Sequence, residues 1–219
     1  LLDAGGNTLL DVGFWDGSPR AFVQSAPGRV DWIRLVADQP GQFERRTHFE
    51  LDEGEEIVAF SASGDLQAVV VQDEGCGEMR FYGSDGEPLA LRGPPPPTCT
   101  FPGRPSFGAV ALNPDGGAVA YTIVTYRDDG TEQVTDLAAR ELLADNGPFA
   151  SRRIGEDLDM VTSLTYDGER VAYVRSSTEG SSVTLLDLTP GSSELAVDLL
   201  AAQQVTSVTF TRVPLDIVP

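Results

Sequence analysis

Lysine is absent from this sequence, and histidine and cysteine are nearly so. All 15 basic residues are arginine, there are one histidine and two cysteines, and 34 acidic residues give a formal charge of −19. The negative electrostatic field of such a chain repels the phosphate backbone of a nucleic acid. The largest basic clusters that could offset it are the arginine pairs at 45–46 and 152–153. We therefore expect no nucleic-acid partner.

Long apolar runs are also lacking. No stretch approaches the roughly 18 apolar residues that cross a bilayer, and residues 1–12 do not show the charged start and apolar core of a signal peptide. We expect no membrane insertion in this segment. Because the chain begins with Leu1 and not with methionine, we interpret it as a mature form or an excised domain.

The sequence does contain a repeat. The turn dipeptides Asp16-Gly17, Ser63-Gly64, Asp115-Gly116 and Asp167-Gly168 lie 47, 52 and 52 residues apart. Each is flanked by two short alternating apolar runs, which predicts a β-hairpin. A third run follows in every unit, and a fourth is expected at 43–51, 88–93, 141–145 and 194–200.

Each unit of about 50 residues is thus predicted to hold four antiparallel strands. Such a sheet cannot bury both faces alone, so neighbouring units must stack face to face. The fold class is all-β, and the architecture is a β-propeller with four-stranded blades. We expect a single domain over 1–219, with blades at about 7–52, 55–100, 107–146 and 160–200 and an extra strand at 205–212.

Two of the turns carry a family signature. Leu112–Tyr121 reads LNPDGGAVAY and Leu164–Tyr173 reads LTYDGERVAY. Both segments resemble the F-S-P-D-G-x-x-I-A-Y repeat of the TolB-like, WD40-like (PD40) propellers, and FSASGDLQAVV and VGFWDGSPRAFV are looser copies. The VTDL and LLDL ends of two third strands are similar to the V-x-D-L close of such blades. The resemblance covers almost the whole chain and implies a blade, not an activity.

Four blades and one extra strand allow two arrangements. Closed rings usually have about four to eight blades. The chain forms either a four-bladed ring with a closing strand or part of a larger ring whose other blades lie elsewhere or come from another copy. We favour the partial ring because four-bladed rings are uncommon, and an incomplete ring would favour self-association.

The two cysteines are expected to pair. In a blade, the loop between the second and third strands and the exit from the fourth strand lie on one face of the propeller. Cys76 lies in the former and Cys99 in the latter. A bridge would close a 24-residue loop, worth about 3 kcal/mol in the chain-entropy model. It would indicate an oxidising, extracytoplasmic compartment, whereas unpaired thiols would fit a cytosolic protein.

Residues for catalysis are sparse. His48 falls in a fourth strand without a G-x-S-x-G elbow, so we interpret it as an ordinary outer-strand residue. Aspartates recur near the first hairpins, where a turn aspartate that binds its own backbone explains them. No catalytic residue is assigned, although a glycosidase with paired carboxylates remains an alternative. The recurring aspartates are Asp11, Asp16, Asp115 and Asp167.

Metal sites are weakly indicated. Arg127–Glu132 and Gly155–Asp159 bring oxygen ligands together, but neither has the D-x-D-x-D-G spacing of a calcium loop. Cys76 and Cys99 lack the CxxC spacing of a zinc site. We assign no metal ligand and expect no cofactor, with a calcium ion in the central channel left open.

Aromatic and arginine side chains fall into two groups. Trp15, Trp32, Phe81 and Tyr82 lie at strand positions and are expected to pack between blades. The second group lies in or next to loops on the face that carries the cysteines, and tyrosine and arginine there are frequent interface anchors. The predicted partner-binding residues are Arg104, Phe107, Tyr126, Arg127 and Asp128.

These observations favour a non-catalytic binding or scaffold module of a bacterial envelope or secreted protein. It would present propeller loops to a protein or peptide partner. The alternative is a propeller-type glycoside hydrolase, or an accessory or gating domain of a hydrolase.

Overall fold

The structure is a computed structural model, and it describes residues 7–15, 18–36, 39, 41–73, 76–91, 106–126, 133–142, 152–158, 160–177, 180–188, 197–202 and 208. Fifteen β-strands and no helix occur among these residues. The all-β class expected from the alternating runs is confirmed. The same residues contain no helix long and apolar enough to cross a membrane.

The strands form four antiparallel sheets, which we call blades 1 to 4 in chain order. Within each blade every strand pairs with the one that follows it in the sequence, so each sheet is a meander. Blade 1 holds β1 (Thr8–Trp15), β2 (Ser18–Ala26), β3 (Arg29–Leu35) and β4 (Phe43–Glu50), and blade 2 holds β5 (Glu56–Ser63), β6 (Leu66–Asp73) and β7 (Cys76–Tyr82). Blade 3 holds β8 (Ser106–Leu112), β9 (Ala118–Tyr126), β10 (Gln133–Glu141) and β11 (Arg152–Leu158), and blade 4 holds β12 (Met160–Tyr166), β13 (Arg170–Ser177), β14 (Gly180–Asp187) and β15 (Val197–Ala202).

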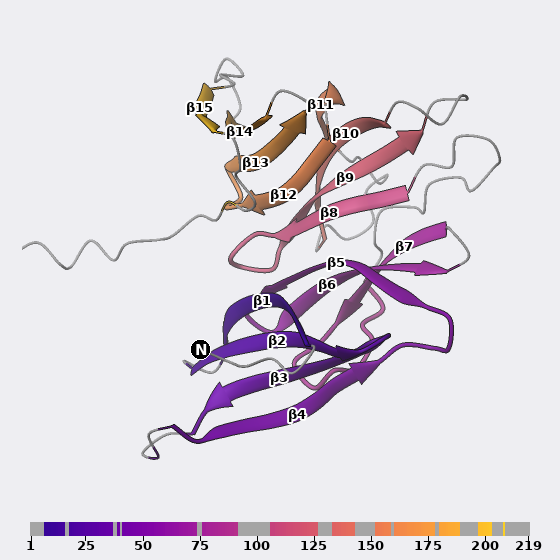
Figure 1. The fold of residues 1–219 in the computed structure, drawn as a ribbon, viewed down its shortest axis with the longest axis vertical. Helices are drawn as coiled ribbons and strands as arrows, with labels where there is room; N and C mark the ends of the chain where they lie inside the picture. The colour runs from indigo at the N-terminus through magenta and orange to yellow at the C-terminus, as the bar shows by residue number, and fades with distance from the viewer. Residues whose placement is uncertain are drawn as a thin grey trace, which may run out of the picture.

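The blades pack face to face. Figure 1 shows them following one another from blade 1 at the bottom to blade 4 at the top. Three apolar clusters fill the spaces between successive blades, and the removal of these side chains from water stabilises the stack. The clusters include Phe22, Phe49 and Tyr82 between blades 1 and 2, Phe81, Phe107 and Tyr121 between blades 2 and 3, and Tyr166, Tyr173 and Leu186 between blades 3 and 4.

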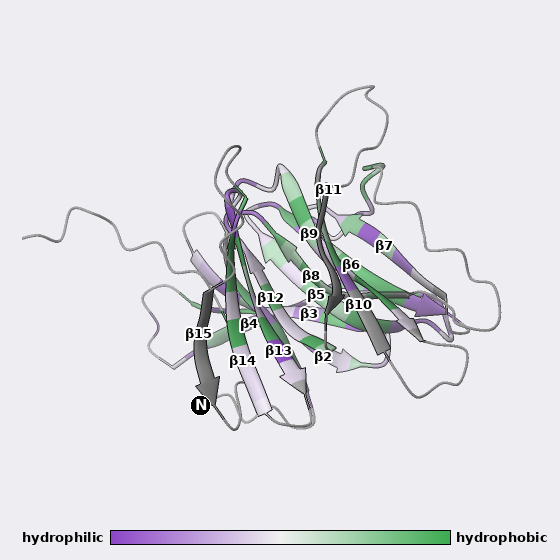
Figure 2. Ribbon diagram, turned by 90° about the horizontal axis from the view of Figure 1, so that it is seen from above, coloured by the Kyte–Doolittle hydropathy of each residue, from purple (hydrophilic) through white to green (hydrophobic). Residues whose placement is uncertain are grey.

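The first strands of the blades lie side by side, with β1 next to β5, β5 next to β8 and β8 next to β12. The second strands of blades 2 and 3 are covered on both faces by neighbouring blades. β6 is accordingly apolar, with Val69 and Val70 fully buried, and Figure 2 shows β6 and β9 largely in the hydrophobic colour. This is the arrangement of a propeller, in which the first strands face a common axis.

The turns of the repeat join the first and second strands. Gly116 and Gly168 have φ angles of 70° and 102°, which residues with a side chain rarely adopt. In blade 4, Oδ1 of Asp167 accepts hydrogen bonds from the backbone N–H groups of Glu169 at 3.0 Å and Arg170 at 2.6 Å. The interpretation of this aspartate as a residue that binds its own turn is confirmed.

The fourth strand of blade 3 differs from the expectation. A strand at 141–145 was expected, but β10 continues to Glu141 and the fourth strand is β11. β10 continues because Leu137, Ala138 and Ala139 are buried and no glycine or proline interrupts its pairing with β9. Most of the acidic segment 155–159 therefore lies within β11.

The fourth strand of blade 2, expected at 88–93, is reduced to a bridge between Tyr82 and Pro88. The backbone N–H of Leu89 donates to the carbonyl of Phe81 at 2.8 Å. Pro88 has no N–H for a ladder, and four more prolines follow in the sequence at 94–97. Within the described ranges, blade 2 therefore has three strands and the other blades have four.

Of the extra strand expected at 205–212, the structure describes only Val208. The backbone N–H of Val208 donates to Oγ of Ser163 in β12 at 3.2 Å. Val208 thus lies next to the first strand of blade 4, where the first strand of a fifth blade would begin. The strand itself stays a prediction.

The expected core aromatics are buried where the structure describes their side chains. Trp32, Phe81 and Tyr82 all lie in the interiors between blades, and the ring of Tyr82 stacks on Phe49 with centroids 4.1 Å apart. The guanidinium of Arg20 covers Trp32 at 4.5 Å from its ring centroid. The side chain of Trp15 lies outside the description.

Candidate functional site

The first strands of the four blades enclose a groove of about 860 Å³. It runs along the axis about which the blades are stacked, so every blade contributes to its wall. Its described lining comes mainly from residues 9–12, 58–63, 107–112 and 160–166, with Gln72, Pro114, Val124 and Val208.

Each of the four first strands has a β-bulge or irregularity near its start. The pairing shifts between Leu9 and Asp11, between Ile57 and Ala59, between Phe107 and Val110, and between Val161 and Ser163. An extra residue bends the strand locally and redirects its side chain. Because the irregularity recurs in all four blades, the redirected residues gather around one end of the groove.

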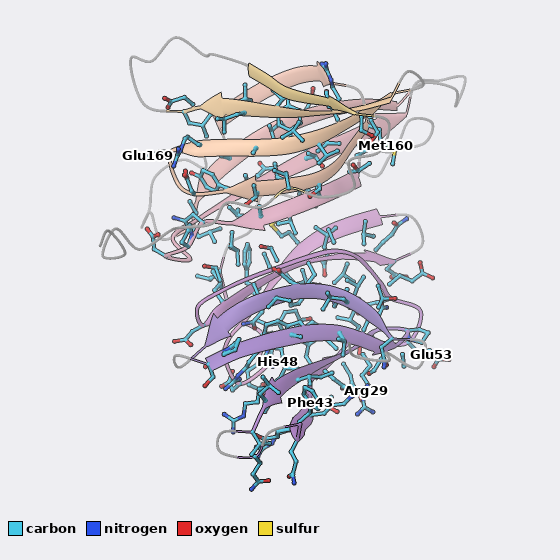
Figure 3. All side chains as sticks on the ribbon, turned by 60° about the vertical axis from the view of Figure 1, so that its left-hand side comes forward. Arg29, Phe43, His48, Glu53, Met160 and Glu169 are labelled. Atoms are coloured by element: carbon cyan, nitrogen blue, oxygen red, sulfur yellow. The ribbon has the colours of Figure 1, made fainter. Side chains whose placement is uncertain are left out.

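Apolar side chains are exposed along this groove. Seven large hydrophobic residues are exposed among the described residues, and four of them, Leu9, Val12, Val58 and Met160, line the groove at 45–59% exposure. We call the end of the blades at which the first strands begin the loop end. Figure 3 shows Met160 and Glu53 on this side and Glu169, in a first hairpin, on the opposite side.

Asp11 supplies a carboxylate to the groove wall. Its Oδ2 accepts a hydrogen bond from the backbone N–H of Ala62 in β5 at 2.8 Å, and its Oδ1 accepts one from Val12 at 2.7 Å. Burial raises the pKa of Asp11 above its ordinary value, and these two hydrogen bonds oppose the rise. The side chain therefore links the first strands of blades 1 and 2.

The same kind of link recurs along the stack. Oγ of Ser61 in β5 accepts from the backbone N–H of Leu112 in β8 at 3.0 Å, and Oγ of Ser163 accepts from Val208. In each case a side chain on one first strand accepts from the backbone of the next unit. Sequence reasoning missed these links because their partners are 45 to 51 residues apart.

The described groove lining has one acidic residue, Asp11, and no histidine. A glycosidase needs two carboxyl groups about 5 to 10 Å apart, so the described lining does not show that pair. The described residues also hold no cluster of three metal-ligating side chains. The calcium candidates at 127–132 and 155–159 have side chains outside the description, and that question stays open.

Of the predicted partner-binding residues, the structure describes the side chain of Phe107 alone. Phe107 lies in β8 at 1% exposure and meets the ring of Tyr121 edge-on at 5.5 Å. It packs between blades 2 and 3 near the start of β8, so its ring is not exposed on a loop, and its role in partner binding stays a prediction. Tyr126 ends β9 at the loop end, but its side chain and the residues Arg104, Arg127 and Asp128 lie outside the description.

His48 lies in β4, the outer strand of blade 1, as interpreted from the sequence, but it is buried. It sits at a bulge in β4, is 7% exposed, and its Nε2 lies 2.8 Å from the side-chain amide of the fully buried Gln67 in blade 2. Oriented to satisfy its neighbours, that amide nitrogen also donates to the carbonyl of Gly83 at 2.8 Å. Burial lowers the pKa of His48 below its ordinary value. The residue is a polar contact between blades.

Neither a family model nor a curated protein matches the sequence. Among solved structures, the chain is similar to a prolyl endopeptidase with a TM-score of 0.54 and 12% identity, over 94% of this chain and 31% of that one. It is also similar to TolB from Acinetobacter baumannii (TM-score 0.40, 12% identity, 83% and 52% coverage). A third similar structure is the β-propeller domain of Cps50 (Swd1) from Myceliophteria thermophila (TM-score 0.46, 10% identity, 90% and 61% coverage).

The chain spans 31% to 61% of the length of these three structures. At 10–12% identity the likeness concerns the fold alone. The meander topology, the face-to-face packing of the blades and the groove that all four first strands share confirm the propeller architecture predicted from the repeat. The chain forms four consecutive blades of a β-propeller.

Proposed function

We propose that this protein is a non-catalytic binding module that presents the loop end of its blades to a protein or peptide. The observation that carries the proposal is the gathering of Leu9, Val12, Val58 and Met160 along one groove. Exposed apolar area costs about 25 cal/mol per Å² relative to burial. Clustered apolar side chains rimmed by polar ones are typical of a surface that a partner covers.

The groove has the dimensions and chemistry of a site for an extended segment. Its volume of about 860 Å³ lies within the usual range of ligand clefts. Ser61, Ser163 and Thr165 add polar groups to its wall, and Asp11 adds a carboxylate. With a net charge of −19 on the chain, a partner with apolar and basic side chains is the best match.

The proposed location of the protein is the cell envelope or the outside of the cell, and this proposal depends on a disulfide between the two cysteines. Cys76 begins β7, while Cys99 and the side chain of Cys76 lie outside the description. The pairing of Cys76 with Cys99 therefore remains a prediction, and so does the compartment inferred from it.

Peptide selection on the purified chain tests the binding role. A displayed library of random-sequence peptides is selected against the wild-type protein, and the recovered peptides are measured against Val58→Asp and Met160→Asp. We expect peptides that combine apolar and basic side chains, and we expect both variants to weaken their binding.

Leu89→Asp is the matched control, because Leu89 is exposed but is not among the residues that line the groove. It should bind as the wild type does. If the selected peptides bind all three variants equally, or if no peptide is enriched, the groove is not the binding surface. Circular dichroism establishes that each variant is folded.

A further inference from the structure

Blade 1 has an apolar face that no other blade covers in the described residues. Trp32 and Phe22 point toward blade 2. Since side chains alternate along a strand, Ile33 and Leu35 of β3 point to the opposite face. We call this the outer face of blade 1, and its apolar side chains outside the groove lining include Ile33, Leu35 and Phe43.

Leu35 and Phe43 pair directly across β3 and β4 on this outer face. They are 58% and 54% exposed. Neither is among the described residues that line the groove, so they are separate from the surface proposed for peptide binding. Figure 3 shows Phe43 at the lower end of the molecule, away from blades 2 to 4.

The corresponding faces of the other blades are buried. In blade 2, the face that carries Val69 and Val71 packs against blade 1. In blade 4, the face that carries Val171 and Tyr173 packs against blade 3. Each of these sheets presents an apolar face to the blade before it. The outer face of blade 1 has the same position and an apolar character, so its natural complement is another sheet face.

The distribution of charge indicates where two copies can meet. Residues 8–50 contain six acids and five arginines, a net charge of −1, whereas the remaining 176 residues contain 28 acids and ten arginines, a net charge of −18. Two such chains repel each other over most of their surfaces. Repulsion is smallest when the blade 1 surfaces face each other.

The charged groups on the outer face are already paired. Asp31 is buried between Arg29 and Arg45, whose Nε atoms lie 3.0 Å and 2.7 Å from its two oxygens. Burial alone would raise the pKa of Asp31, but these hydrogen bonds hold it below its ordinary value. A second sheet could therefore cover this face without leaving an unpaired carboxylate inside the interface.

From these observations we propose that the outer face of blade 1 is a self-association surface, on which a second copy of this chain packs its own blade 1 about a two-fold axis. The contact is isologous, so Leu35 and Phe43 of each copy lie in the same interface. The proposal goes beyond peptide binding, because its contact residues Leu35 and Phe43 lie outside the groove lining and its partner is a second copy of the chain.

The area of the outer face sets the expected affinity of the dimer. Four strands about 4.8 Å apart and eight residues long, at about 3.3 Å per residue, cover about 500 Å² per copy. About 1,000 Å² in total is at the lower limit of a specific interface. A weak dimer with a dissociation constant of about 10 to 100 µM is the expected result.

Sedimentation equilibrium of the full chain over a range of concentrations tests the proposal. A monomer–dimer equilibrium is expected, and Leu35→Asp with Phe43→Asp in one chain should weaken it by about tenfold or more, since the change places four carboxylates in the contact. Leu35→Ala with Phe43→Ala should weaken it less. Leu89→Asp, on an exposed residue elsewhere, should leave it unchanged.

The ionic strength gives a second readout that a purely structural defect would not reproduce. Salt screens the repulsion between two chains of charge −19, so the dimer should be tighter at high salt than at low salt. A chain that is monomeric up to about 200 µM at both salt concentrations, where a 100 µM dimer would be clearly visible, would overturn the proposal. A dimer that persists in the Leu35→Asp and Phe43→Asp variant would also overturn it.

Discussion

The backbone N–H of Ala62 donates a 2.8 Å hydrogen bond to Oδ2 of Asp11, across the junction between the first strands of blades 1 and 2. The two residues are 51 positions apart, about one repeat. Ser61 and Leu112 repeat the relationship one blade further along. The stack is therefore held by backbone-directed hydrogen bonds near its axis as well as by apolar clusters between its faces.

Replacement of Asp11 tests this junction. Asp11→Ala leaves the N–H of Ala62 without its acceptor, so we expect the free energy of unfolding to fall by about 1 to 2 kcal/mol. Asp11→Asn keeps a side-chain oxygen and should cost less. Urea denaturation followed by tryptophan fluorescence measures both. Equal stability of Asp11→Ala and the wild type would show that the hydrogen bond contributes nothing.

The contact of Gly86 with His48 predicts a large effect from one methyl group. Gly86 has a φ of +81°, and a Cβ there would lie 1.8 Å from the carbonyl oxygen of His48. Gly86→Ala therefore clashes with the backbone of blade 1. We expect it to lower the unfolding free energy by about 3 kcal/mol or more.

Gly54→Ala is the matched control for this substitution. Gly54 has a similar φ of +95°, but a Cβ there meets nothing within 4 Å. It should cost only the left-handed backbone strain of about 1 to 2 kcal/mol. If thermal unfolding shows equal losses in the two variants, the packing of the Gly86 turn on blade 1 is not a significant contact.

Acid should weaken the junction between blades 1 and 2 through His48. Burial lowers the pKa of His48 in the folded state, while the unfolded chain takes up the proton near 6.5. The unfolded state then binds more protons, so stability falls as the pH drops below about 6.5, by at most about 1.4 kcal/mol per pH unit. The charged groups that act on His48 are Arg20, which opposes protonation, and Asp85, which favours it.

His48→Gln is the comparison for this pH dependence. Melting temperatures of both proteins between pH 7.5 and 5.5 should show a smaller decline in the variant. The carboxylates with lowered pKa values, Asp31, Glu44 and Glu55, lose their contributions at lower pH, because unfolded aspartate and glutamate titrate near 4. Parallel pH profiles for the two proteins would assign the decline to other groups.

The pairing of Cys76 with Cys99 is tested by the intact mass after thiol alkylation with and without reduction. We expect added mass only after reduction, because a bridge leaves no free thiol to alkylate. The wild type should also lose stability on reduction, whereas a Cys76→Ser and Cys99→Ser variant should not respond. Labelling of both thiols without reductant would remove the argument for an extracytoplasmic compartment.

Much of the fold follows from local sequence. Turns such as Asp115-Gly116 and Asp167-Gly168 require a positive φ at glycine, and the runs beside them alternate because each strand has two faces. These features recur in every unit, and most of the strands could be predicted from them. The failures at 88–93 and 141–145 have local causes, since proline stops one strand and a buried alanine-rich segment extends another.

The sequence by itself determined that this protein is a stack of antiparallel β-blades, because strand, turn and burial pattern are encoded within about 50 residues. Only the tertiary structure decided which side chains meet between blades. His48 lies against Gln67 19 residues away, Asp11 binds Ala62, and Phe107 is buried instead of exposed. Such contacts depend on how one sheet is placed against the next, and alternation along a single strand does not specify that placement.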